Sequence, residues 1–343
     1  MERVLAAGLF AMVLSILAGP KFIQFLRRHE FGQMIREEGP AGHAVKQGTP
    51  TAGGLLMVGS MTVSFLALSH YTAEGLTVFG VTLACAGIGF ADDYIKIRHR
   101  RSLGLSGRWK LLLLAGITLG VGLVVYDLDF GTSVYVPVLD WSVPLAFGFY
   151  LLLFLVLAGA ANGANLTDGI DGLAVGVGII ALLTFTAMNV FTYIRSGQLA
   201  EQGQDLAALD LAILGASLIG GAIGFLWYNA FPAEVFMGDT GSMAIGGALG
   251  GFAIMSQSEL LLLLIGGIFV IEALSVILQV ASFKWWGRRI FLMTPIHHHF
   301  EMKAWSETKI MVRFWILAAI LCAGAFALYY QYLRGFRPDL FQT

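Results

Sequence analysis

The feature that most constrains this chain is a series of long apolar segments, which leaves little room for a soluble domain. Charged residues make up 13% of the sequence, against roughly 25% in an ordinary soluble domain. A bilayer core needs about 20 apolar residues per helix. Ten segments approach this length: 4–25, 51–70, 75–91, 110–126, 142–161, 172–194, 208–228, 241–256, 260–282 and 310–332. The pattern predicts an all-α integral membrane protein with about ten transmembrane helices in one domain, residues 1–343.

The basic residues are distributed unevenly between the two sides of the predicted membrane. Sixteen of the 21 Lys and Arg residues lie in or next to the loops 26–50, 92–109 and 283–309. Because loops rich in Lys and Arg remain in the cytoplasm, we expect these loops, with 162–171 and 229–240, to be cytoplasmic. Ten spans then place both termini outside. The outer segment 127–141 has β character and predicts a small hairpin.

Polar clusters lie at the cytoplasmic ends of these apolar segments. They are Asp92–Asp93, residues 162–172, residues 229–242, and the triplet His297–His299 with Glu301. Polar groups at membrane depth are costly and tend to be retained for function. We therefore expect chemistry at the lipid–water boundary.

The aspartates are the strongest candidates for that chemistry. Asp92 and Asp93 are expected to end the third helix, where acids suit the helix dipole poorly and where Lys96, one turn on, can compensate them. A solvated helix end is the alternative. Asp239 precedes the eighth helix, where it could cap N–H groups or bind Mg²⁺, which usually takes one or two carboxylates plus substrate phosphates.

The three consecutive histidines do not suit a zinc site. Neighbours on a helix point about 100° apart, and neighbours on a strand alternate between faces. Imidazoles that hydrogen-bond phosphate or carry protons fit better. The alternative is a His-rich surface loop.

Two further segments could bind phosphate. The Asn-, Asp- and Gly-rich loop 162–172 indicates either a capped turn or a nucleotide site. Lys46 and Thr51 open the second helix, and a helix N-terminus with hydroxyls and a Lys can bind phosphate. No P-loop or dinucleotide-binding motif is present in the sequence.

Taken in order, these motifs resemble the polyprenyl-phosphate N-acetylhexosamine-1-phosphate transferase superfamily. The resemblance runs from Lys46–Thr51 to Pro295–Glu301, and the triple His with Glu301 points to its muramoyl-pentapeptide branch. It implies a ten-helix fold with a cytoplasmic site. It also implies transfer of phospho-MurNAc-pentapeptide from UDP-MurNAc-pentapeptide to undecaprenyl phosphate, with Mg²⁺, giving lipid I and UMP.

The expected site residues come from the motifs and from this resemblance. Asp92, Asp93 and Asp239 match the essential acids of the superfamily, with Asp239 as the Mg²⁺ ligand, and His298 is a fourth catalytic candidate. The residues expected to bind substrate are Lys46, Thr51, Lys96, Asn165, Asp168, Asp171, Asn229, Phe236, Gly238, Gln279, His297 and His299. Glu272 and Gln279 are expected near the pocket or a lipid groove.

The resemblance also sets the expected partners. These are UDP-MurNAc-pentapeptide, undecaprenyl phosphate and the lipid bilayer of the bacterial cytoplasmic membrane. A homodimer is expected, and no nucleic acid.

Several alternatives remain open from sequence. A related UDP-GlcNAc-type transferase shares most of these motifs. An intramembrane aspartyl protease would need glycine at Phe236 and acids deeper in the bilayer. An ion-coupled transporter would place ionisable groups near the middle of the membrane, where only Glu272 lies. For a transferase, direct attack and a covalent aspartyl-phosphate intermediate are both compatible with the sequence.

Overall fold

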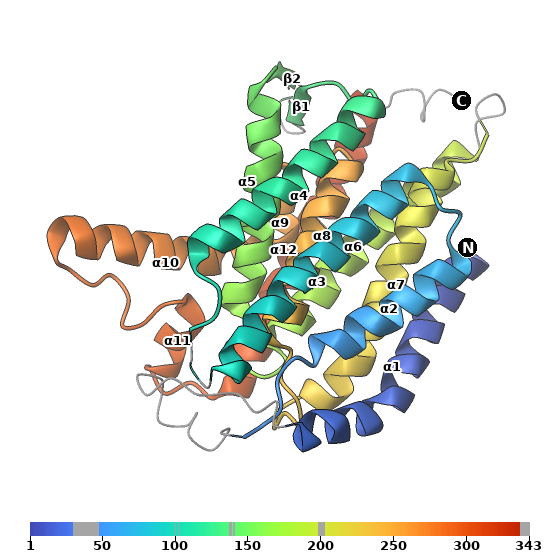
Figure 1. Ribbon diagram of the computed structural model, residues 1–343. Helices are drawn as coiled ribbons and strands as arrows, with labels where there is room; N and C mark the ends of the chain where they lie inside the picture. Colours follow the sequence, from blue (N-terminus) through green and yellow to red (C-terminus); the bar gives the residue numbers. More distant parts are fainter. Residues whose placement is uncertain are drawn as a thin grey trace.

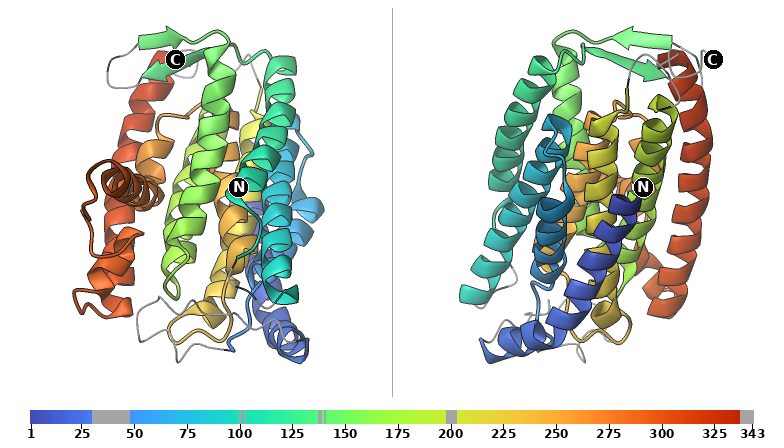
Figure 2. Two further views of the ribbon diagram at one scale, coloured as in Figure 1. Left: turned by 60° about the vertical axis from the view of Figure 1, so that its left-hand side comes forward. Right: turned by 90° about the vertical axis from the view of Figure 1, so that its right-hand side faces the viewer.

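Long helices form where the sequence has its apolar segments, and a small β-hairpin crosses one end of the bundle (Figures 1 and 2). The structure, a computed structural model, describes residues 1–29, 48–99, 101, 103–136, 139, 141–197 and 203–336. The elements in chain order are α1 (Glu2–Arg28), α2 (Gly54–Leu68), α3 (Ala73–Arg98), α4 (Gly107–Asp127), β1 (Ser133–Val136), β2 (Trp141–Pro144), α5 (Gly148–Thr167), α6 (Leu173–Ser196), α7 (Leu206–Asn229), α8 (Gly238–Met255), α9 (Leu262–Ile265), α10 (Gly267–Trp286), α11 (Ile296–Glu301) and α12 (Glu307–Phe336).

The fold class predicted from the sequence is confirmed. Among the described residues, eight helices are long and apolar enough to cross a membrane, and α2 is a shorter apolar helix. The remaining long helix, α8, has 18 residues. The chain is therefore a multi-pass membrane protein.

Helices α6, α7 and α8 form the core of the bundle. The most apolar windows of α6 and α7 are 78% and 83% buried, against 28% for α1, α4 and α12. Helix α8 is buried from Thr240 to Met255 and packs against α3 and α5. It is rich in Gly and Ala, whose small side chains let helices approach closely without help from the hydrophobic effect.

The ninth apolar segment, residues 260–282, is not the single helix that the sequence predicted. Helix α9 ends at Ile265 and α10 starts at Gly267. Helix α10 projects away from the bundle (Figure 1) and exposes a large apolar surface. The break falls at Gly266 and Gly267, and small residues of this kind are a recognised cause of sharp kinks.

Helices also extend further into the polar clusters than predicted. Helix α3 continues to Arg98, so Asp92 and Asp93 lie inside it and not at its end. Helix α5 continues to Thr167, so the predicted loop 162–171 is mostly helical. The predicted loop 283–309 likewise contains the short helix α11. The helices can continue because other helices supply partners for their polar side chains, as the site shows.

The hairpin predicted at 127–141 is confirmed, but its second strand extends into the segment assigned to the fifth helix. Strands β1 and β2 pair antiparallel, from Ser133 opposite Pro144 to Val136 opposite Trp141. Helix α5 consequently begins at Gly148. Val143 directly precedes Pro144 in β2. A residue before a proline is pushed towards extended conformations, so this stretch forms a strand and not the start of the helix.

One buried carboxylate organises the α2–α3 connection, at the opposite end of the bundle from the polar clusters. Asp210 on α7 is 0% exposed. It accepts hydrogen bonds from Ser69 Oγ at 2.9 Å, His70 N at 2.7 Å and Thr72 N at 2.9 Å. Thr72 in turn caps α3 by accepting a hydrogen bond from Gly75 N. The start of α3 is therefore held by α7.

We expect Asp210→Ala to lower the free energy of unfolding by about 2–3 kcal/mol, because buried donors would lose a charged acceptor. Thermal unfolding of the detergent-purified protein measures the change. The matched control is Asp127→Asn, which removes an exposed carboxylate at the end of α4. Equal melting temperatures for the two variants would contradict the bracing role of Asp210.

Candidate active site

A pair of aspartates bridged by two lysines forms the centre of the site. Asp92 on α3 and Asp239 in the first turn of α8 come from helices packed side by side. Lys96 Nζ lies 2.6 Å from Asp92 Oδ2 and 3.0 Å from Asp239 Oδ1. Lys110 Nζ, from α4, lies 3.2 Å from Asp92 Oδ1 and 2.7 Å from Asp239 Oδ2. Two ammonium groups thus offset two carboxylates that would otherwise repel each other.

The third aspartate holds the start of α8. Asp93 is 3% exposed, and its carboxylate accepts hydrogen bonds from Asp239 N and Thr240 N, each at 3.0 Å, and from Thr240 Oγ1 at 2.7 Å. A carboxylate at a helix N-terminus satisfies free N–H groups and favours the helix dipole. The sequence allowed Asp239 to cap α8. In the structure, Asp93 from α3 caps α8 instead.

The segment before α2 packs directly on this helix start. Phe236 N donates to Pro50 O, and Gly53 N donates to Phe236 O, both at 2.8 Å. Thr51 is buried. A Cβ on Gly238 would lie 2.6 Å from Asp93 Oδ2 and 2.9 Å from Thr51 Oγ1, and Gly238 also has a φ of +72°. Only glycine therefore fits this position without strain.

Asp168 is the acid next to this cluster. It follows the last residue of α5 and is half-buried. Burial, together with the nearby negative charges of Asp239 and Asp93, raises the pKa of Asp168 well above its usual range. Among the described residues its carboxylate has no hydrogen-bond partner. This disagrees with the alternative reading of Asp168 as a residue that merely caps a turn.

Asn165 lies one turn before Asp168 and faces α8. Its Nδ2 donates to Ser242 Oγ at 3.0 Å. The side chain is half-buried. This hydrogen bond joins the end of α5 to the first turns of α8.

Asn229 and Asp171 join the two loops that flank the site. Asn229 Oδ1 accepts from Gly172 N at 3.0 Å, and its Nδ2 donates to Val235 O at 2.9 Å. Asp171 Oδ2 accepts from Ala233 N at 3.1 Å. Both side chains therefore shape the loops from within, whatever else they bind.

The histidines occupy three different environments. His297 is 0% exposed, and its Nδ1 lies 3.1 Å from Oε1 of the equally buried Glu272 on α10. Its Nε2 has no hydrogen-bond partner among the described residues. A Cβ placed on Gly169 would lie 2.3 Å from that nitrogen. The first histidine thus connects α10 to the loop that carries Asp168.

The other two histidines contact their own segment. His298 Nδ1 pairs with Glu301 Oε2. His299 Nδ1 accepts a hydrogen bond from Leu292 N at 3.1 Å. Gln279 likewise accepts hydrogen bonds from Ile290 N and Phe291 N. Gln279 and His299 therefore hold residues 290–292, and no contact links them to the acids within the described ranges.

Most of the predicted site residues converge, although Lys46 lies outside the described residues. One important member was missed: Lys110 was counted only as part of a basic loop. It lies 18 positions after Asp92 in the sequence, so no local spacing rule connects the two. Thr240 was missed as well, because it acts only through its contact with Asp93.

The acids also form a plausible site for a divalent cation. Asp92, Asp93 and Asp239 can each present a carboxylate oxygen such that all three atoms lie within 4.8 Å of one another. Hard cations such as Mg²⁺ prefer oxygen ligands of this kind. Asp92 Oδ2 is buried and has no hydrogen bond of suitable geometry within the described part of the chain, whereas Asp93 is already bonded to α8. Asp92 therefore has an oxygen available for a metal, whereas the oxygens of Asp239 are bonded to Lys96 and Lys110, which a cation at Asp239 would have to displace.

Comparisons with known proteins agree with this architecture. The family model "Glycosyl transferase family 4" matches residues 76–257, more than half of the chain. A phospho-N-acetylmuramoyl-pentapeptide-transferase of Frankia alni is 43% identical over 96% of this chain and 98% of that protein. The proteins of the same name from Rubrobacter xylanophilus (97% and 99%) and a Geobacillus species (93% and 96%) are also 43% identical. The chain therefore belongs to glycosyl transferase family 4, among relatives named phospho-N-acetylmuramoyl-pentapeptide-transferase.

Proposed function

We propose that this protein transfers phospho-MurNAc-pentapeptide from UDP-MurNAc-pentapeptide to undecaprenyl phosphate. The products are lipid I and UMP, and the reaction is the first membrane step of peptidoglycan synthesis. The observation that carries the proposal is the Asp92–Lys96–Asp239–Lys110 cluster. It lies at the end of a membrane bundle in a chain 43% identical to such transferases over nearly its full length.

The location of the cluster suits two substrates of opposite solubility. The nucleotide donor is too polar to enter lipid, and the polyprenyl acceptor is too apolar to leave it. Chemistry between them needs a site at the headgroup level, where helix ends meet water. The exposed apolar surface of α10 would keep the lipid acceptor next to the bundle.

The transfer is best described as a direct attack. An oxygen of the acceptor phosphate forms a bond to the phosphorus that carries the sugar, and the bond from that phosphorus to the UMP oxygen breaks. Asp92 orients the acceptor and takes its remaining proton where one is present. A phosphate monoester has a second pKa near ~6, so most of the acceptor is already a dianion and needs no base. A trapped labelled phospho-enzyme would instead support an aspartyl-phosphate intermediate.

Positive charge must offset the anions that this reaction brings together. Lys96 and Lys110 already lie between the carboxylates, and they can turn to substrate phosphates as those arrive. Mg²⁺ held by Asp239, with Asp92, would neutralise charge that develops on the leaving UMP. Asp93 keeps Asp239 in place through the start of α8.

The remaining residues frame the donor. Asn165 and Asp168 face the nucleoside and sugar, while Asn229 and Asp171 shape their loops, and Phe236 and Gly238 line the wall formed by the start of α8. Thr51, and Lys46 from outside the described residues, are our candidates for binding phosphate. His298 approaches the reacting phosphates, and His297, His299 and Gln279 hold the surrounding segment.

The orientation follows from charge. Sixteen of the 21 basic residues lie in or next to the sequence segments 26–50, 92–109 and 283–309, and this bias supports a cytoplasmic location for the end of the bundle that carries the site. Both termini are then extracytoplasmic. A homodimer in the cytoplasmic membrane remains our prediction.

The decisive experiment is an assay of UMP release by detergent-purified protein with UDP-MurNAc-pentapeptide, undecaprenyl phosphate and Mg²⁺. A UDP-GlcNAc donor serves as the control. Magnesium-dependent UMP release with the muramoyl donor alone supports the proposal. Preference for the GlcNAc donor would assign the protein to a different branch of the family.

We expect Asp239→Asn to lower kcat by at least about 10²-fold, a loss typical of removing one charge-stabilising group. Because a neutral amide binds Mg²⁺ weakly, the Mg²⁺ concentration for half-maximal activity should also rise. Asp205→Asn, which changes an aspartate at the other end of the bundle, is the control. Near-normal turnover of Asp239→Asn would remove this residue from the metal site.

Lys110→Gln should lower kcat by roughly 10- to 10³-fold while the protein still folds, because one cation that offsets phosphate charge is lost. Lys110→Arg should recover part of the activity, since it keeps the charge. Lys303→Gln changes an exposed lysine and serves as the matched control. If Lys110→Gln and Lys303→Gln turn over equally fast, Lys110 has only a structural role.

Asp168→Asn separates function from stability. The raised pKa means that the folded protein binds a proton to Asp168 more tightly than the unfolded chain does. Stability is then lost as pH rises above the ordinary Asp pKa, and an amide removes that loss. We expect thermal stability at pH 8 to be unchanged or about 2 °C higher, with UMP release strongly reduced. A clear fall in melting temperature would assign Asp168 a structural role instead.

A further inference from the structure

Helix α1 bends where it carries Pro20, and α7 supports the bend. A proline has no N–H, so the carbonyl of residue i−4 loses its helical partner. That carbonyl belongs to Ile16, and Tyr228 Oη donates a hydrogen bond to it at 2.7 Å. A Cβ on Gly19 would lie 2.2 Å from the Tyr228 ring, so only glycine leaves room for this contact. The bend is therefore built into the packing of α1 on α7.

The part of α1 after the bend lies across the end of the bundle (Figures 1 and 2). It is amphipathic, because Ile23 and Leu26 are buried while Lys21, Gln24 and Arg27 are exposed. These three polar residues follow each other at intervals of three positions and so share one face of the helix. Phe25 is 49% exposed, and basic residues beside an exposed aromatic suit a membrane interface.

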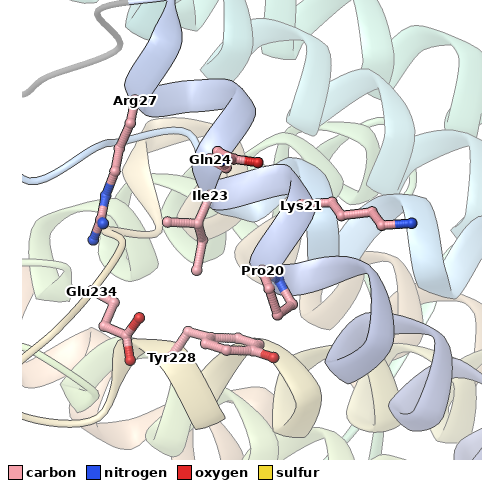
Figure 3. Close-up of a pocket in the computed structure, with 7 residues that line it drawn as sticks. All are labelled: Pro20, Lys21, Ile23, Gln24, Arg27, Tyr228 and Glu234. Atoms are coloured by element: carbon pink, nitrogen blue, oxygen red, sulfur yellow. The ribbon is translucent and has the colours of Figure 1, made fainter.

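That polar face borders a cavity. The cavity has a volume of about 430 Å³ and is lined by Pro20, Lys21, Ile23, Gln24, Arg27, Tyr228 and Glu234. Figure 3 shows that the Arg27 side chain runs along one side towards Glu234, that Tyr228 lies below Pro20, and that Lys21 extends on the other side, away from Arg27. The space is large enough for a phosphate-bearing headgroup.

The charges around the cavity are unbalanced. Lys21 and Arg27 carry positive charge, and Glu234 is the single acid in the lining. Among the described residues, neither cation has a carboxylate partner within ion-pair distance. One positive charge therefore remains uncompensated, which matches one phosphodiester. A zwitterionic headgroup has no net charge and would leave this positive charge uncompensated. A phosphomonoester dianion carries two negative charges and would leave a net negative charge in the cavity.

We propose that this cavity binds the headgroup of an anionic phospholipid, such as a phosphatidylglycerol, through Lys21 and Arg27. The site is separate from the acidic cluster, since none of its lining residues belongs to the proposed catalytic machinery. It lies at the end of α7 that leads into the 229–236 loop. A bound lipid would hold α1 against that loop, in the membrane leaflet that faces the site.

Native mass spectrometry of the full-length protein, titrated with phosphatidylglycerol in detergent at 0.15 M salt, tests the proposal. The variants are Lys21→Gln and Arg27→Gln, with Arg28→Gln as the matched control. Arg28 is a neighbouring exposed cation on the same part of α1 but lies outside the cavity. At this salt concentration, attraction to distant exposed charges is largely screened.

We expect each cavity variant to weaken phosphatidylglycerol binding at least about tenfold and Arg28→Gln at most about threefold. Phosphatidylcholine should bind weakly to all forms. If all three variants lose affinity for phosphatidylglycerol equally, binding depends only on the overall surface charge, and the proposed site is wrong. Equally tight binding of glycerol 3-phosphate would assign the cavity to a soluble phosphate. Because the three residues are exposed, thermal unfolding should confirm that each variant is folded.

Discussion

The contact between Asp93 and the first turn of α8 is the interaction on which the site depends. The carboxylate belongs to a residue inside α3. It accepts hydrogen bonds from two backbone N–H groups and one hydroxyl at the start of α8. It thereby sets the depth at which α8 begins and the position of Asp239 opposite Asp92. Without this contact the remaining acids would have no defined separation, and no defined metal or phosphate site could form between them.

Charge balance explains why such a cluster can exist at the end of a membrane bundle. Buried acids are costly unless they are paired and hydrogen-bonded. Asp93 is paired with a helix N-terminus, while Asp92 and Asp239 share Lys96 and Lys110. These pairs are also exchangeable, because an arriving phosphate can replace a carboxylate at either lysine. The same groups can therefore stabilise the resting protein and handle anions during transfer.

Lys110, whose loss is expected to lower turnover, was not predicted as a site residue from the sequence. The apolar segments predicted the order and approximate positions of the long helices, and the motif order predicted the family. Helix ends were less accurate: Asp92 and Asp93 proved to be inside α3, and most of residues 162–171 belong to α5. In a sequence, charged residues and Asn–Gly pairs predict the end of a helix, because the sequence does not show which groups they contact. Here those groups come from other helices.

By itself, the sequence determined which segments enter the membrane and that the polar clusters gather at one end. Both follow from segment length, apolar composition and charge bias, which are local properties of the chain. Tertiary structure decided that Asp93 caps α8, that Lys110 joins the acids, that α10 departs from the bundle and that Tyr228 supports the bend in α1. Each of these depends on two segments distant in sequence meeting within hydrogen-bond or packing distance, and only the packing of the helices determines which pairs meet.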